Sequence, residues 1–150
     1  MNLPIINNNF FTRYWTFECV SQEEWKKFLR LAKLFFEMFL NSREQREQIT
    51  FEFLDCKSDD DVMGDGTFII SCFDGQEKFN FRAGFCNTKR LQPYDDYVFA
   101  MIYFASRFFG KKFIYDFEDR NHCYAEINDN DKRISLRVDN LLKDNKNIFD

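Results

Sequence analysis

The chain has 150 residues, enough for one domain with a substantial core, and 19% of them are aromatic, including 21 phenylalanines. Its formal net charge of −4 and its pI near 5.1 argue against capture of nucleic acid by the whole surface. The five cysteines form no C-x-x-C pair, which excludes a zinc ribbon or thioredoxin motif. Their odd number, with no leader expected, favours reduced thiols in a cytoplasm.

The first half of the chain predicts a strand, a long helix and a second strand. Residues 10–20 are rich in aromatic and β-branched residues and predict a strand. Ser21 and Glu24 form a capping box that starts an amphipathic helix over 22–41. The apolar stripe of this helix comprises Trp25, Phe28, Leu29, Ala32, Phe35, Phe36, Phe39 and Leu40. Residues 49–54 alternate between apolar and polar and predict the second strand.

The middle of the chain predicts a hairpin and a buried helix. Residues 67–73 and 78–86 predict two strands joined by a turn at Asp74 and Gly75. The helix predicted over 93–109 is apolar nearly all round but too short to span a bilayer, so we expect the rest of the chain to wrap it. Negative charge in its first turn suits the helix dipole, and Gly110 suits its end.

The C-terminal third predicts mainly strands. Residues 112–117 and 123–127 predict two strands, 128–131 a turn, 133–138 a last short strand and 139–150 a short helix or a tail. The expected fold is a single α+β domain over 1–150, with a mainly antiparallel sheet of about five to six strands packed by two long helices, 22–41 and 93–109.

Catalytic and metal-binding patterns are weak. His122 is the one histidine, in a predicted turn, and its neighbour Cys123 points the other way on an extended chain, so no triad or dyad is predicted. A carboxylate pair such as Glu52 and Asp116 is only a formal option for an enzyme. Motifs for phosphate or dinucleotide binding are absent from the sequence, and we expect no cofactor.

The acidic stretch 57–66 partly resembles a calcium loop. Asp59, Asp61 and Gly64 match positions one, three and six of an EF-hand. Met63 and Ile70 stand at positions five and twelve, where ligands belong, so the match fails. We expect a solvated loop and no metal site, and the alternative is a weak divalent site formed by Asp59, Asp60, Asp61 and Asp65.

The stretch 85–95 resembles a segment, F-C-K-T-x-R-K-P-Y-D followed by an apolar helix, of small bacteriophage and prophage proteins. The matching residues are Phe85, Cys86, Asn87, Thr88, Arg90, Pro93, Tyr94 and Asp95. Asn87 replaces the lysine of that pattern, and one extra residue separates Thr88 from Pro93. The resemblance covers about 67–127 and implies a phage or mobile-element setting without a mechanism.

Acidity, surplus aromatics and the weak catalytic patterns favour a non-enzymatic binding protein in the host bacterial cytoplasm. We expect an acidic inhibitor of a host nuclease or defence complex, similar to anti-CRISPR proteins, whose carboxylates imitate phosphate. The expected contact residues are Asp59, Asp60, Asp61, Asp65, Asp74 and Glu77. An immunity protein that neutralises a nuclease toxin is the first alternative.

Two further arrangements stay open. One is a single-stranded nucleic-acid-binding sheet face, which the net charge disfavours and whose candidate residues are Arg13, Tyr14, Lys78, Asn80 and Arg82. The other is a homodimer, because Leu31, Leu34 and Met38 widen the apolar stripe of the first helix.

Overall fold

The computed structural model describes residues 11–40, 49–54, 66–72, 75, 77–88, 94–118 and 124–150. Its strands are β1 (Phe11–Phe17), β2 (Ile49–Leu54), β3 (Thr67–Cys72), β4 (Lys78–Asn80), β5 (Phe85–Thr88) and β6 (Phe113–Glu118). Its helices are α1 (Gln22–Phe39), α3 (Tyr94–Phe109), α4 (Tyr124–Asp144) and α5 (Lys146–Phe149), with 3-10 turns η3 (Phe81–Ala83) and η4 (Gly110–Lys112). The predicted α+β class is confirmed.

The strands form two three-stranded antiparallel sheets, in the orders β5-β1-β6 and β2-β3-β4. The prediction of one sheet of five to six strands is therefore wrong. The division arises where a single strand was expected over 78–86. There the Asn80 side chain accepts a hydrogen bond from the Arg82 backbone N–H at 3.0 Å, which starts η3. Gly84 then takes a left-handed φ of 86°, and β5 continues in the other sheet.

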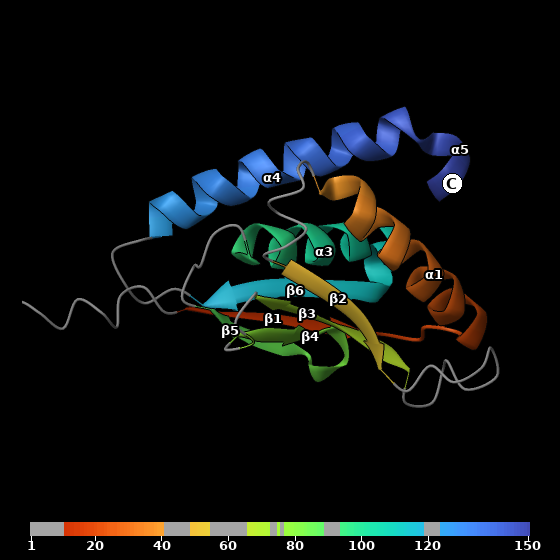
Figure 1. The fold of residues 1–150 in the computed structure, drawn as a ribbon, viewed down its shortest axis with the longest axis horizontal. Helices are drawn as coiled ribbons and strands as arrows, with labels where there is room; N and C mark the ends of the chain where they lie inside the picture. Colours follow the sequence, from red (N-terminus) through yellow and green to blue (C-terminus); the bar gives the residue numbers. More distant parts are fainter. Residues whose placement is uncertain are drawn as a thin grey trace, which may run out of the picture.

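Helix α3 lies at the centre of the molecule (Figure 1). Figure 1 shows α4 on the side of α3 that faces away from the sheets, with α1 crossing beside them. Tyr94, Val98 and Ile102 are buried along its length, as the sequence predicts for a wrapped helix. Gly110 has a φ of 61° and ends the helix in the left-handed conformation, as expected.

Helix α1 has the predicted capping box. The Glu24 backbone N–H donates to the Ser21 hydroxyl, and the Ser21 backbone N–H donates to the Glu24 carboxylate, both at 3.1 Å. All predicted stripe residues from Trp25 to Phe39 are buried, and Leu40 is half-buried. In the second stripe, Leu31 and Met38 pack against the core, whereas Leu34 is exposed.

Helix α4 replaces the predicted C-terminal strands. The strands expected over 123–127 and 133–138 and the turn expected over 128–131 are wrong, because the described part of this stretch, from Tyr124 onward, is one helix. Asp131, Ile134 and Val138 are its buried residues in this region, spaced by three and four, which is helical periodicity. The described residues therefore contain three long helices, α1, α3 and α4, where two were expected.

The core is built largely from phenylalanine. Phe81 in η3 is fully buried and makes ring contacts with Trp15, Phe17, Trp25, Phe28, Phe68, Phe79 and Phe113. Phe35 of α1 stacks on Phe104 of α3, with ring centroids 4.4 Å apart. Because η3 joins the two sheets, this aromatic packing fixes them around α3.

Some apolar surface is left outside the core. Tyr14 of β1 pairs with Phe85 of β5, and both side chains are exposed, as is Ile114 of β6. In the register of the sheet, Ile114 is paired with Thr16, which alternates with the buried Trp15, so these residues share the outward face.

Candidate functional site

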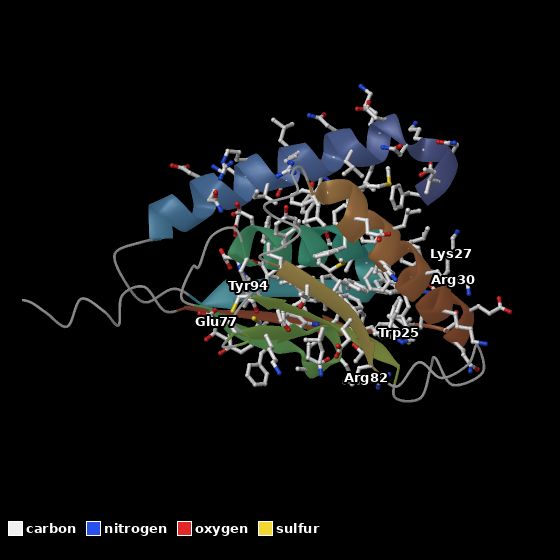
Figure 2. All side chains as sticks on the ribbon, viewed as in Figure 1. Trp25, Lys27, Arg30, Glu77, Arg82 and Tyr94 are labelled. Carbon is white, nitrogen blue, oxygen red and sulfur yellow. The ribbon has the colours of Figure 1, made fainter. Side chains whose placement is uncertain are left out.

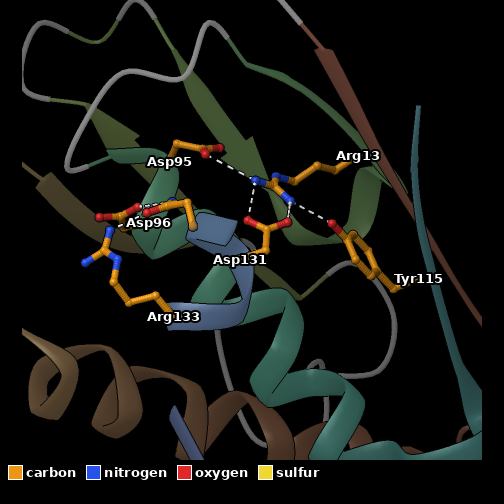
Figure 3. Close-up of polar contacts among 7 residues, drawn as sticks. Arg13, Asp95, Asp96, Tyr115, Asp131 and Arg133 are labelled. Carbon is orange, nitrogen blue, oxygen red and sulfur yellow. Dashed lines mark hydrogen bonds and ion pairs between the residues drawn. The ribbon is translucent and has the colours of Figure 1, made fainter. Parts of the chain in front are cut away.

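A buried polar cluster surrounds Arg13 of β1 (Figure 3). One guanidinium nitrogen donates to the Tyr115 hydroxyl at 2.6 Å and to Asp131 Oδ2 at 2.8 Å. The other donates to Asp131 Oδ1 and to Asp95 Oδ2, both at 3.1 Å. The guanidinium also lies 4.9 Å from the ring centroid of Phe99. The cluster thereby joins β1, β6, α3 and α4.

The position of Arg13 follows from strand alternation. Arg13 shares the inward face of β1 with Trp15 and Phe17, and it is fully buried. A charge at that depth is tolerated only when oppositely charged groups surround it. Asp95, in the first turn of α3, and Asp131 of α4 supply them.

The electrostatics make Arg13 a permanent cation. Burial by itself lowers the pKa of Arg13, but Asp95, Tyr115 and Asp131 outweigh burial and hold that pKa well above its ordinary value. Burial raises the pKa of Asp131, and Arg13 opposes that rise. One buried cation thus faces two buried carboxylates, so the cluster has an excess of acid.

A shallower network lies beside this cluster (Figure 3). The Asn130 side-chain amide donates to Asp96 Oδ1 at 2.9 Å, and Arg133 donates to the Asn130 side-chain oxygen. Both Asn130 and Arg133 belong to α4, so this network is a second link between α4 and the first turn of α3.

The residues of the phage-like segment contribute to packing around Arg13. Cys86 of β5 and Tyr94 and Asp95 of α3 are all buried, while Phe85 is exposed. The backbones of Asn87 and Thr88 lie in β5. Arg90 and Pro93 lie outside the described residues.

The Cys86 thiol is not arranged as a nucleophile. Burial raises its pKa to about 12, and burial likewise raises the pKa of the adjacent Tyr94 hydroxyl. Both groups therefore stay protonated at neutral pH. The contact between the Cys86 and Tyr94 side chains packs β5 against the start of α3.

The predicted acidic contact lies mostly outside the described residues. Five of its six residues lie outside the described part of the chain, namely Asp59, Asp60, Asp61, Asp65 and Asp74. Glu77 is half-buried in the turn after β3, where its backbone carbonyl accepts from the Cys72 N–H at 3.1 Å. Figure 2 shows Glu77 near Tyr94. Glu77 follows the C-terminal end of β3, whereas the segment 55–65 precedes the N-terminal end of that strand. The length of β3, roughly 17 Å, therefore separates Glu77 from the point where the segment is attached.

That attachment is held by the core. The Gly66 carbonyl accepts hydrogen bonds from Trp25 Nε1 at 3.1 Å and from Arg82 at 3.3 Å. Leu54 and Thr67, on either side of the segment, are paired in the β2–β3 ladder. A cavity of about 290 Å³ lies beside this point, lined by Phe17, Cys19, Val20, Trp25 and Arg82.

A second, larger hollow is a groove of about 420 Å³ between α3, α4 and β6. Phe99 and Tyr103 of α3 and Tyr115 of β6 supply its aromatic wall. Asp131 and Asp139 of α4 supply its carboxylates. The Asp139 carboxylate accepts from the Tyr103 hydroxyl at 2.8 Å and from Arg107 Nε at 3.0 Å.

Several other predicted candidates are separated by the fold. Arg13, a nucleic-acid candidate, is in the core, whereas Tyr14 lies on the outward face of β1. Lys78 and Arg82 are exposed, and Asn80 is half-buried.

The catalytic candidates are not brought together either. Glu52 and Asp116 lie on strands of different sheets. In the described part of the chain, no three His, Cys, Asp or Glu side chains gather as metal ligands would, and His122 lies outside that part.

The Arg13 cluster was missed from the sequence, although two signals pointed to it. Arg13 has the strand parity of Trp15 and Phe17, which predicts an inward side chain. Asp131 has the helical spacing of Ile134 and Val138, which predicts a buried acid that requires a partner. The turn expected over 128–131 instead included Asp131, and Arg13 was expected on a nucleic-acid-binding strand face.

Among the described residues, no helix is long and apolar enough to cross a bilayer. Comparison with protein-family models, with curated proteins and with solved structures found no match.

Proposed function

We propose that this chain is a non-enzymatic binding protein of a phage or mobile element that neutralises a basic, nucleic-acid-binding protein. A host nuclease or defence complex is the proposed target, as for anti-CRISPR proteins. The resemblance of residues 85–95 to phage proteins supports the setting. The distribution of charge along the chain supports the mode of action.

The observation that carries the proposal is the concentration of acid in one segment. Residues 55–65 contain five aspartates and one lysine, a formal charge of −4, which equals the net charge of the whole chain. The rest of the chain is neutral overall, so the attraction for a basic surface is concentrated at one place. A local cluster of carboxylates complements a channel that binds phosphates.

The fold supports presentation of this segment. Its two ends are joined by the β2–β3 ladder through Leu54 and Thr67. The carbonyl that follows it, at Gly66, is held by the buried Trp25. The residues on either side of the segment are thus held by the aromatic core.

The alternatives differ in what they bind. An immunity protein for a nuclease toxin would use the same acidic segment on a different nuclease. Direct binding of single-stranded nucleic acid loses support because Arg13 is buried and ion-paired. Lys78 and Arg82 remain as basic candidates, but the net charge of the chain is negative, which disfavours binding of nucleic acid.

The test is affinity capture from a bacterial cytoplasm, with mass spectrometry of the eluate and measurement of the nucleic acid it contains. We expect one basic, nucleic-acid-binding protein in stoichiometric amount. The triple change Asp59→Ser, Asp60→Ser and Asp61→Ser should abolish its capture. Nucleic acid in the eluate without such a protein would overturn the proposal.

A matched control removes the same charge elsewhere. Glu37, Glu52 and Asp144 are exposed on α1, β2 and α4. Changing these three to serine should preserve capture. Equal loss from both triple variants would show that only net charge matters and would contradict a localised contact.

A further inference from the structure

Strand β2 forms one edge of the sheet β2-β3-β4, and among the described strands only β3 pairs with it. Figure 1 shows β2 in front of the other strands. Natural proteins usually protect such an edge with lysine, proline, a bulge or a covering element. The sequence of β2, ITFEFL, contains no lysine and no proline, and its register with β3 continues without a bulge. This edge is therefore a template for a further strand.

The register shows which backbone groups of β2 point away from β3. The Cys72 backbone N–H donates to the Glu77 carbonyl at 3.1 Å, on the β4 side of β3. Because the backbone groups alternate in direction along a strand, Ser71 bonds toward β2, where it is paired with Thr50. The same alternation along β2 directs the N–H and C=O groups of three residues outward, namely Ile49, Phe51 and Phe53.

The outward groups of β2 lie beside apolar side chains. No other described residue hydrogen-bonds to the outward groups of Phe51 and Phe53. The Phe53 side chain is 38% exposed and Phe51 is half-buried, with ring centroids 5.3 Å apart. Thr50 and Glu52 alternate with them and are exposed. A strand added at this edge would therefore gain main-chain hydrogen bonds and cover the Phe53 ring.

Two copies of β2 complement each other when they pair antiparallel about Phe51. In that register Phe51 is paired with Phe51 of the second copy, and Ile49 with Phe53 of the second copy. Each outward residue thus meets an outward residue, as hydrogen-bonded pairs require. Glu52 lies opposite Thr50 of the second copy, whereas a register centred on Glu52 would place two carboxylates opposite each other. The charge of Glu52 therefore selects the register centred on Phe51.

Charged residues of α1 complement each other across the same axis. The ring centroid of Phe36 lies 5.2 Å from that of Phe51, so the axis passes beside Phe36. The Lys33 ammonium lies 5.9 Å from the centroid of the Phe53 ring, and Glu37 is about one turn further along α1. Both charged residues are exposed. Because Lys33 precedes Phe36 and Glu37 follows it, a two-fold axis brings Lys33 of each copy toward Glu37 of the other.

We propose that this chain forms a symmetric dimer in which β2 pairs antiparallel with β2 of a second copy about Phe51. The pairing joins the β2-β3-β4 sheets of the two copies into one continuous sheet. The inference is independent of the proposed function, because it uses the edge of β2 and the exposed face of α1 rather than the acidic segment.

Sedimentation equilibrium of the full chain over a range of concentrations tests the dimer, and two substitutions of the exposed Thr50 test its register. Thr50→Lys places a cation opposite Glu52 of the second copy and should strengthen dimerisation by about ten-fold, because the two-fold axis repeats the contact. Thr50→Glu places like charges there and should weaken dimerisation by about ten-fold. The matched controls are Thr16→Lys and Thr16→Glu, on the exposed face of β1, which should leave the dissociation constant unchanged.

A second pair of variants tests the backbone contact. Phe53→Ala removes the ring and should weaken the dimer, whereas Phe53→Pro also removes an outward N–H and should abolish it, with the β2–β3 ladder intact. Urea denaturation of both variants measures their folding. A chain that is monomeric at all concentrations, a dissociation constant that ignores the charge at Thr50, or equal dimerisation of the two Phe53 variants would overturn the inference. A monomer that loses a captured partner through Phe53→Pro would also overturn it and would assign the edge to a strand of that partner.

Discussion

Arg13 of β1 and Asp131 of α4, 118 residues apart in the chain, are joined by two hydrogen bonds of 2.8 and 3.1 Å between the guanidinium and both carboxylate oxygens. This bidentate pair fixes the C-terminal helix against the sheet. Because the guanidinium also binds Asp95 and Tyr115, its loss affects three other elements at once. The cluster therefore governs the stability of the layers on which the proposed binding surfaces are built.

Replacement of Arg13 by methionine should lower the free energy of unfolding by about 3–5 kcal/mol, because it leaves two buried carboxylates without their cation. Urea denaturation followed by tryptophan fluorescence measures this loss. Arg107→Met is the control, since its ion pair with Asp139 is exposed and should cost less than about 1 kcal/mol. Similar losses in both variants would contradict the central role of the buried cluster.

The pH dependence of stability should reveal the buried Asp131. Its folded-state pKa is raised, first by burial, so its contribution to stability is fully present below the unfolded-state pKa and is lost as pH rises through the folded-state pKa. We compare the free energy of unfolding of the native chain with that of the Asp131→Asn variant at each pH. The advantage of the native chain over the variant should fall as pH rises, by up to about 1.4 kcal/mol per pH unit.

Glu24 provides a control of opposite sign. Hydrogen bonds, first from Lys112, lower the pKa of Glu24, so its contribution is present above the unfolded-state pKa and is lost as pH falls through the lowered value. The difference between the native chain and Glu24→Gln should therefore grow with rising pH. The same slope for both variants would refute the assigned environments.

Gly84 should resist substitution because of its backbone conformation. Its φ of 86° disfavours side chains, while an added Cβ would meet the Trp15 carbonyl oxygen at 3.4 Å, an ordinary contact. Gly84→Ala should cost about 1–2 kcal/mol in thermal or urea denaturation. Gly84→Asn should cost less, since asparagine tolerates the left-handed region better. If asparagine is no better than alanine, crowding rather than φ is the cause.

Among the phenylalanines of η3 and its two flanking strands, Phe81 should cause the largest loss of stability when it is truncated to alanine. It is fully buried among seven aromatic rings, so Phe81→Ala should destabilise the fold by about 3–5 kcal/mol. Phe85→Ala, four residues later on the exposed face of β5, should cost far less. Denaturation curves of the two variants compare them directly, and equal losses would contradict the assigned core.

The elements that local patterns determine were predictable. The capping box of Ser21 and Glu24 and the stripe from Trp25 to Phe39 were sufficient for α1, because each depends on neighbours within one or two turns. The apolar run between Asp95 and Gly110 likewise predicted the wrapped helix α3.

Elements that depend on tertiary contacts were not predictable in the same way. Alternation of Phe79 and Phe81 continues through the point where the strand breaks, and only Gly84 marked the change of sheet. The β-branched residues Ile134 and Val138, after the turn-like sequence 128–131, favoured strands over α4. The partners of Arg13 are 82 and 118 residues away, so no local pattern could pair them.

The measurement that tests the central claim most directly is the affinity of the captured partner for the native chain and for the Asp59→Ser, Asp60→Ser, Asp61→Ser variant at two salt concentrations. We predict that the affinity of the native chain falls steeply as the salt concentration rises from about 50 to about 300 mM, because salt screens the attraction between exposed charges. At low salt the variant should bind at least ten-fold more weakly than the native chain. An affinity that is unchanged by the three substitutions and insensitive to salt would contradict the claim that this protein acts through its acidic segment.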